Sequence, residues 1–212
     1  MLDIHSLDIP QASSNEGYVV KRQIVLSATR TLQSAVEWAQ SPRTPFSLPA
    51  FVIDRDGTIY KLFNPSRWSY YLRLGAQDRL VINVALANCG PLRRHTDGRF
   101  YPIRLDSHSM PIPDTSQPSV RLFYEFCTRQ PHHGFTHYEL ITPAQLRSLA
   151  DLLSVLLIQN SIFYRFDPLT GGVTPDFRQG RPGIYLACGI DGHRPDLHPQ
   201  PELIRLLKTL SD

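Results

Sequence analysis

The sequence predicts a single α/β domain in which helices pack on a mixed central β-sheet. Short apolar runs of strand length occur at residues 23–27 and 81–87, and an Asp-Gly turn joins two further runs within residues 51–63. Leucines recur at helical spacing in residues 142–160 and 202–210. Strand patterns that alternate with helical patterns are typical of this fold class. A length of 212 residues and a hydrophobic content of 42% suffice for one core.

The first half of the chain predicts strands, a helix and a hairpin. Residues 23–27 (QIVLS) form an apolar run that indicates a buried strand. Residues 31–40 have apolar side chains at helical spacing, and Pro42 ends this predicted helix. Residues 51–53 and 58–63 predict two strands of a hairpin, because the Asp-Arg-Asp-Gly between them is a strong turn signal.

The second half predicts two strands and two helices. Residues 81–87 (VINVALA) and 183–187 (GIYLA) indicate core strands. The string Thr-Pro-Ala-Gln at residue 142 predicts a helix start, with Thr as the N-cap, Pro in the first turn and Gln completing a capping box. A leucine stripe extends this helix to about residue 160, and four leucines on one side predict a last helix over residues 202–210.

The organisation predicted from these patterns is one domain with an extension and an insertion. Residues 1–20 are polar and are interpreted as an N-terminal extension, and residues 21–212 as the domain itself. Residues 93–138, which are rich in proline and histidine, are expected to form a long loop insertion with a few short strands.

Composition and charge narrow the function classes. A net charge of +3 gives no strong basic footprint, so no nucleic-acid partner is expected. Three cysteines without CxxC spacing argue against a disulfide framework and favour a reducing compartment. No apolar stretch reaches the roughly 18 residues of a membrane span, and no secretory signal is visible. We therefore expect a cytoplasmic protein, with export by a signal-less route as the alternative.

Four strings in the same order and spacing resemble the N-acetylmuramoyl-L-alanine amidase family. They are FVIDRDGTIYKLF at residues 51–63, VINVALANCGPL at 81–92, the helix string that begins ITPAQ at 141–157, and PQP at 199–201. This family includes bacterial cell-wall amidases, phage amidases and animal peptidoglycan recognition proteins. The resemblance covers residues 23–207 and implies an amidase/peptidoglycan-recognition-like fold and a bacterial or phage origin.

The resemblance also implies a zinc site, because the family holds zinc with two histidines and a third Asp, His or Cys. Such a metal leaves one position for a water and lowers the pKa of that water. At the positions that match the three ligands this sequence has Ser27, Cys188 and His198. A glutamate and a lysine of the family, which handle protons and charge, correspond to Ala85 and Asp196.

Two further histidines of the family are also missing, since their positions carry Ala50 and Ser69. Serine is a poor zinc ligand, and two ligands rarely hold zinc at useful affinity. The sequence therefore predicts an amidase-like pseudoenzyme that has lost its catalytic residues and its cofactor.

A rewired metal site is the alternative. In a second alignment, Gly-His-Arg at residues 192–194 resembles the string around the second zinc histidine, which would keep His193 and His198 as ligands beside Cys188. Further histidines lie in the long loop, namely His132, His133 and His137. A nucleophile pair of Cys188 with a histidine is a third possibility, although a cysteine that ends an apolar strand is more often a small buried side chain.

The resemblance implies a ligand groove across the sheet. Aromatic faces suit sugar rings, and an arginine suits a carboxylate. The residues expected to flank this groove are Tyr60, Trp68, Tyr70, Tyr71, Arg73 and Asn88, with Asn83 as a weaker candidate. The alternative for Tyr60 and Trp68 is that they are core residues.

Three functional hypotheses follow. The first is a catalytically inactive domain that binds a muropeptide-like ligand. The second is a divergent zinc-dependent amidase. The third is a protein-interaction scaffold whose contact surface is the 93–138 insertion.

Overall fold

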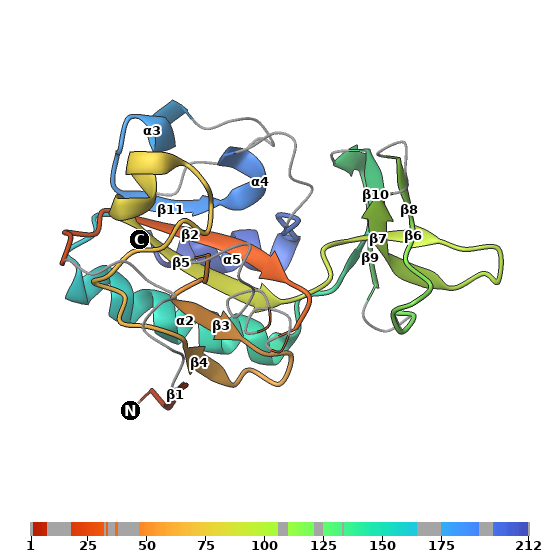
Figure 1. The fold of residues 1–212 in the computed structure, drawn as a ribbon, viewed down its shortest axis with the longest axis horizontal. Helices are drawn as coiled ribbons and strands as arrows, with labels where there is room; N and C mark the ends of the chain where they lie inside the picture. The colour runs from red at the N-terminus through yellow and green to blue at the C-terminus, as the bar shows by residue number, and fades with distance from the viewer. Residues whose placement is uncertain are drawn as a thin grey trace.

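Two β-sheets with helices packed beside them organise the described part of the chain in the computed structural model, in which a central body carries a second sheet at one side (Figure 1). The structure describes residues 2–7, 18–31, 33, 37, 47–105, 110–120, 125–132, 134–164, 175–190 and 197–211.

The central sheet has six strands in the order β1-β4-β3-β5-β2-β11. These strands are β1 (Ile4–Ser6), β2 (Gln23–Thr29), β3 (Phe51–Ile53), β4 (Ile59–Lys61), β5 (Val81–Ala87) and β11 (Gly183–Leu186). The neighbours β3, β5, β2 and β11 run parallel, whereas β3 and β4 form an antiparallel hairpin. The mixed sheet and the hairpin are therefore as predicted.

Two helices cover one face of this sheet. They are α2 (Pro143–Gln159) and α5 (Pro201–Thr209), whose leucines pack on Ile24 and Leu26 of β2. The predicted capping box is confirmed, because the backbone N of Gln145 donates to Thr142 Oγ1 at 3.0 Å and the backbone N of Thr142 donates to Gln145 Oε1 at 3.1 Å. Burial of the leucine stripes thus fixes the helices on the sheet.

The opposite face carries smaller elements. The 3₁₀ helix η2 (Gly75–Leu80) and the short helices α3 (Pro175–Arg178) and α4 (Ala187–Ile190) lie near it. Here Val25 of β2 packs with Leu72 and Phe177. Because side chains alternate along a strand, Leu26 points to the α2 face, and Val25 and Ser27 point to this one.

The second sheet replaces the long loop predicted for residues 93–138. Its five strands are antiparallel in the order β8-β7-β6-β10-β9. They are β6 (Pro91–Arg94), β7 (Phe100–Leu105), β8 (Pro111–Pro113), β9 (Glu125–His132) and β10 (Phe135–Glu139). The prediction for this segment was a long loop with a few short strands, because prolines favour loops, although edge strands such as β8 and first positions such as Pro91 tolerate them.

The N-terminal part of the chain also differs from its prediction. Residues 4–6, expected to lie in an extension, form β1 and pair with β4. Most of the helix predicted for residues 31–40 lies outside the described residues. Of the three that are described, Thr31 is not helical, whereas Gln33 and Glu37 are helical and their side chains share a hydrogen bond of 2.9 Å. Over the described stretches, no helix is long and apolar enough to cross a membrane.

Candidate functional site

The carboxyl ends of β2, β3 and β5 meet at one edge of the central sheet, where the second sheet begins (Figure 1). In open α/β sheets, ligands bind at this edge. The backbone N of Glu139, at the end of β10, donates to the carbonyl O of Gly90 at 3.0 Å. The chain therefore leaves the central sheet after β5 and returns to it before α2 through adjacent residues.

Two arginine–carboxylate pairs join the sheets at this edge. Arg55, in the β3–β4 turn, donates from Nε to Glu139 Oε1 at 2.6 Å and from Nη2 to Glu139 Oε2 at 3.0 Å. Arg30, which follows β2, lies 3.0 Å from Asp114 Oδ2 and donates to the carbonyl O of Ile103 at 2.8 Å. Both carboxylates are buried, at 5% exposure each, so each guanidinium is held from behind in a fixed orientation.

Two pKa values at this edge follow from burial and the Glu139 charge. Burial would lower the pKa of Arg55, but the hydrogen bond and charge of Glu139 raise it above its ordinary value. Burial, with a further contribution from Glu139, raises the pKa of the Cys89 thiol to about 12. Cys89 is therefore a neutral thiol at physiological pH.

The position that the resemblance assigns to the first zinc ligand holds no metal-binding group. Ser27 is 1% exposed, and its Oγ donates to Tyr71 Oη at 3.2 Å. Ala85 lies opposite Ser27 in the register, and Val52 lies opposite Ala85. Ala50 is also buried. This part of the sheet face presents methyl groups where the family resemblance implies polar ligands.

Cys188 lies on the other face and so does not join Ser27 in one shell. It packs in the core cluster under α2 and α5, and its thiol donates to the carbonyl O of Leu197 at 3.3 Å. Ser27 instead faces Tyr71. Ser27 lies on the face opposite Leu26 because side chains alternate along β2, whereas Cys188 follows β11 in the short helix α4.

His198 and His132, from distant parts of the sequence, come together around Tyr138. The His198 ring centroid lies 4.5 Å from that of Tyr138 and 4.9 Å from that of His132. Burial lowers the pKa of His198 to about 4, with a contribution from His132. Burial, together with the charge of Cys188, raises the pKa of Tyr138. Cys188 and His198 therefore both lie close to Tyr138.

The other candidate ligands contribute less. His137 stacks on Phe100 with a ring-centroid distance of 4.5 Å. His133, His193 and Asp196 lie outside the described residues. Within the described ranges, no three His, Cys, Asp or Glu side chains form a group that could hold a metal ion.

Three of the residues predicted to bind a ligand lie together, since the Trp68 ring contacts that of Tyr70 and the backbone N of Arg73 donates to the carbonyl O of Tyr70 at 3.1 Å. Trp68 is 7% exposed and packs edge-on against Tyr70 at 4.8 Å, beneath the guanidinium of Arg79. Trp68 is thus a core residue, as the alternative interpretation expected, whereas Tyr70 is 41% exposed. Arg73 is exposed and has a backbone φ of 59°.

Three further candidates have structural contacts. Tyr60 is partly buried and lies 5.8 Å from the His5 ring. Asn88 is buried; its Nδ2 donates to the carbonyl O of Glu139 at 3.2 Å and its Oδ1 accepts from the backbone N of Gly90 at 2.8 Å. Asn83, on β5, is also buried.

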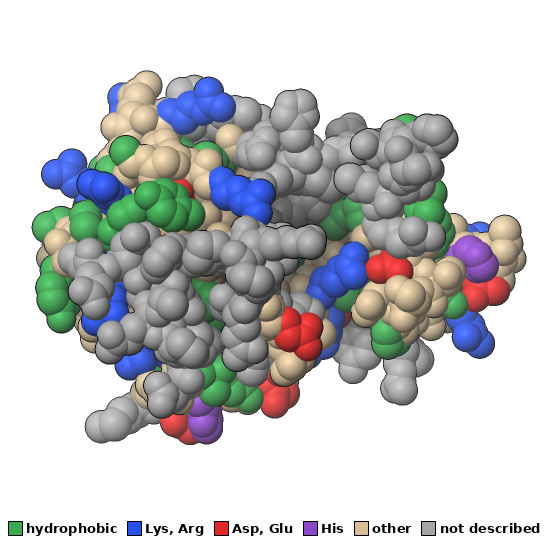
Figure 2. Space-filling view, viewed as in Figure 1, with side chains coloured by type: hydrophobic (Ala, Val, Ile, Leu, Met, Phe, Trp, Pro, Cys, Tyr) green, Lys and Arg blue, Asp and Glu red, His purple; other side chains and the backbone are tan. Residues whose placement is uncertain are grey.

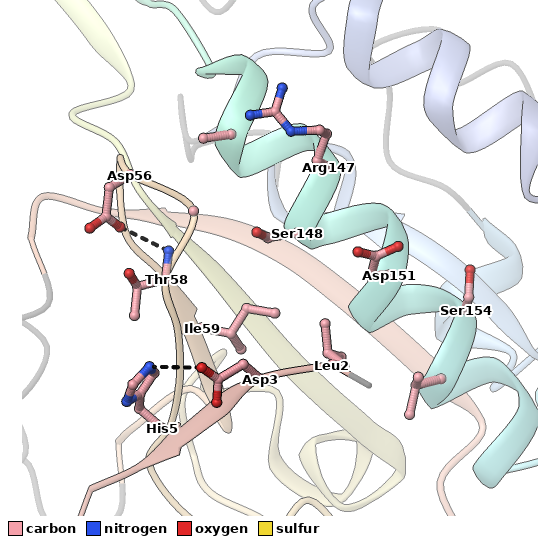
Figure 3. A pocket seen from close by; sticks show the side chains of 13 residues that line it. Leu2, Asp3, His5, Asp56, Thr58, Ile59, Arg147, Ser148, Asp151 and Ser154 are labelled. Atoms are coloured by element: carbon pink, nitrogen blue, oxygen red, sulfur yellow. Dashed lines mark hydrogen bonds and ion pairs between the residues drawn. The ribbon is translucent and has the colours of Figure 1, made fainter.

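A cavity of about 720 Å³ lies between β1, the β3–β4 turn and the outer side of α2 (Figure 3). Asp3 and His5 form an ion pair of 3.6 Å at one end of it, and Asp56 Oδ1 accepts from the backbone N of Thr58 at 2.8 Å. None of the predicted site residues lines this cavity.

Comparisons with known proteins add evidence about the fold. No protein-family model matches the sequence, and no curated protein matches it. Among solved structures, the N-acetylmuramoyl-L-alanine amidase LysC from Clostridium intestinale URNW matches with 13% identity and a TM-score of 0.50, over 90% of this chain and 86% of that one. The chain has the fold of this amidase. The predicted fold class, a single domain with a mixed sheet and flanking helices, is thereby confirmed.

Two other solved structures match more loosely. The endolysin amidase LysCS from the same organism has 11% identity and a TM-score of 0.46, over 90% of this chain and 84% of that one. Drosophila peptidoglycan recognition protein SA has 12% identity and a TM-score of 0.44, over 87% and 80%. Because function does not follow from fold at such identities, it has to be argued from the residues.

Proposed function

We propose that this chain is a catalytically inactive, amidase-fold protein that binds a muropeptide-like ligand. The observation that carries the proposal is Ser27. It occupies the position of the first zinc ligand in the family resemblance, is buried, and has its hydroxyl bonded to Tyr71.

The surroundings of Ser27 do not fit zinc. The metal prefers Cys, His and carboxylate ligands, and the neighbouring strands offer Ala85 and Val52 at this level. The glutamate that the resemblance implies for proton transfer is also missing, because Ala85 stands at its position. Several losses within one preserved fold support binding rather than hydrolysis.

The ligand class follows from the shared fold together with exposed side chains. The LysC name implies recognition of an N-acetylmuramoyl-L-alanine unit, and the proposal extends that recognition to this chain. Tyr70 and Arg73 are exposed and lie within two residues of Tyr71, whose hydroxyl accepts from Ser27. An aromatic ring and a guanidinium can bind a sugar face and a carboxylate, respectively.

Isothermal titration with N-acetylmuramoyl-L-alanyl-D-isoglutamine tests the proposal. We expect Tyr70→Ala to weaken binding about threefold to tenfold, since an aromatic contact contributes ~0.5–1.5 kcal/mol. Phe163→Ala is the control, because Phe163 is another exposed aromatic, at 77% against 41% for Tyr70, and lies beyond the end of α2. If this muropeptide does not bind, the proposal fails and a protein partner becomes the better hypothesis.

A divergent zinc amidase is the second candidate, and the closeness of Cys188 and His198 to Tyr138 favours it. Elemental analysis of the purified protein separates the two functions. Near-stoichiometric zinc that is lost in both Cys188→Ala and His198→Ala would overturn the inactive-protein proposal. A folded protein without zinc would exclude an amidase of the family type.

A further inference from the structure

A second cavity, of about 540 Å³, lies between the carboxyl edge of the central sheet and the second sheet. The central body contributes residues such as Arg30, Arg55, Cys89 and Thr142 to its wall, and the second sheet contributes Pro102 and residues 117–120. Basic and acidic side chains gather at this junction (Figure 2). The volume lies in the range of small-molecule sites, roughly 300–1,000 Å³.

Two guanidiniums face this cavity and are oriented by buried groups behind them. The side chains of Arg30 and Arg55 are 40% and 37% exposed, whereas those of their partners Asp114 and Glu139 are 7% and 6% exposed. A guanidinium has five N–H donors. The hydrogen bonds of Arg30 to Asp114 Oδ2 and to the carbonyl O of Ile103 occupy two of them.

The two carboxylates that line this cavity, those of Glu139 and Asp56, are already engaged as acceptors. Glu139 accepts from Arg55 and from the backbone N of Cys89 at 2.5 Å. Asp56 accepts from the backbone N of Thr58 at 2.8 Å (Figure 3). Cys89 stays uncharged because its thiol pKa is about 12.

The helix α2 adds to this preference. Thr142, its N-cap, lines the cavity, and the helix that follows has 17 residues. The N-terminal end of a helix carries a partial positive charge that attracts anions. The opposite wall is apolar, since Pro102, Pro118 and Val120 line it.

From this juxtaposition we propose that the cavity between the two sheets binds a small carboxylate. The carboxylate contacts Arg30 and Arg55, and an apolar body of a few carbons rests on Pro102, Pro118 and Val120. The site lies at the carboxyl edge of the sheet and is separate from Tyr70 and Arg73, so it goes beyond the proposed function and does not depend on it.

Titration with isocaproate, followed by NMR on the full chain, tests this inference. Isocaproamide is the matched neutral probe, because it has the same carbon skeleton without the charge. We expect saturable binding of the acid, with binding of the amide weaker by at least tenfold, since hydrogen bonds to charged groups contribute more than neutral ones.

Two variants locate the site by different means. Arg30→Gln removes a donor and should weaken binding of isocaproate by at least tenfold, and Ser119→Trp fills the cavity without touching an ion pair and should abolish binding. Arg93→Gln, on an exposed position of β6, is the control and should bind as the wild type does. Tyr70→Ala, which tests the proposed function, should also leave isocaproate binding unchanged.

The inference is overturned if isocaproate does not bind, or if the amide binds as tightly as the acid. It is equally overturned if folded Ser119→Trp binds isocaproate as the wild type does. Since Ser119→Trp keeps Arg30 and Arg55, this outcome does not depend on whether Arg30→Gln folds.

Discussion

Glu139 is the side chain at the junction of the two sheets whose charge we expect to matter most for stability. It is buried and accepts from three donors, namely Nε and Nη2 of Arg55 and the backbone N of Cys89. Glu139→Gln keeps the shape but removes the charge and turns an NH₂ group toward one of these donors. Breaking a buried pair costs about 3–5 kcal/mol. Because the Arg55 side chain is 37% exposed, we expect the lower end, ~3 kcal/mol.

Chemical denaturation with urea, followed by circular dichroism, measures this loss. For a chain of this size, ~3 kcal/mol corresponds to a fall in Tm of about 6–12 °C. Asp176→Asn is the matched control, since Asp176 pairs with Arg181 at 3.3 Å but the two side chains are 40% and 62% exposed. An exposed pair of this kind contributes at most ~0.5 kcal/mol. Equal losses in Glu139→Gln and Asp176→Asn would refute the argument that the buried pair anchors the second sheet.

Three further perturbations have defined outcomes. Because burial lowers the pKa of His198 to about 4 in the folded chain and an unfolded histidine titrates near 6.5, the unfolded chain binds more protons between these values. The free energy of unfolding is therefore highest above about pH 6.5 and falls by up to ~3 kcal/mol toward pH 4. Urea unfolding midpoints measured across this pH range should fall less steeply in His198→Asn than in the wild type. Gln145→Leu removes a fully buried amide that donates to two strand-end carbonyls and accepts from a backbone N; it should cost ~3 kcal/mol in urea unfolding, whereas the exposed Gln159→Leu should cost almost nothing. Gly57 has a φ of +91°, and the methyl group added in Gly57→Ala would lie 3.0 Å from a backbone oxygen of α2. The Tm of Gly57→Ala should therefore fall much further than that of Gly98→Ala, because Gly98 has a φ of +82° but a nearest contact of 3.8 Å.

The central sheet could be predicted because its signals are local. The Asp-Gly turn at Gly57 and the capping box at Thr142 each specify their geometry within four residues, and both are present. The apolar run of β5 is buried at every position, as a central parallel strand requires. Such patterns carry their own structural information, so the order of these elements follows from the sequence.

The second sheet could not be predicted in the same way, because its pairing is non-local. Pro102 lies inside β7 opposite Leu92, a place where sequence patterns argue against a strand. The edge strand β8 consists of two prolines around Ile112. Only the register with β7 and β6 makes these residues strands, and no short-range pattern encodes that register.

The candidate site, too, could be predicted from the sequence only in part. The replacements at Ala85 and Ser27 can be recognised in the sequence, and the two residues lie opposite each other on adjacent strands. The contact of His132 with His198 joins residues 66 positions apart and cannot be inferred from spacing. Alternation along β2 is enough to predict that Ser27 and Leu26 lie on opposite faces of the sheet. The face on which Cys188 lies could not be predicted in this way, because it depends on the short helix α4.

The contacts that anchor the second sheet indicate whether the cavity between the two sheets is already formed before a ligand binds. Besides the two arginine pairs, the buried amide of Gln200 donates to the carbonyl O of Glu139 at 2.8 Å and accepts from the backbone N of Ile141 at 3.1 Å. Asn88 bonds the same carbonyl from the other side of the junction. Two buried polar side chains, those of Gln200 and Asn88, thus help to fix the segment where the chain returns to the central sheet. Since little ordering remains to be done on binding, we expect the wall of the cavity to be preformed, which lowers the entropic cost of binding a small ligand.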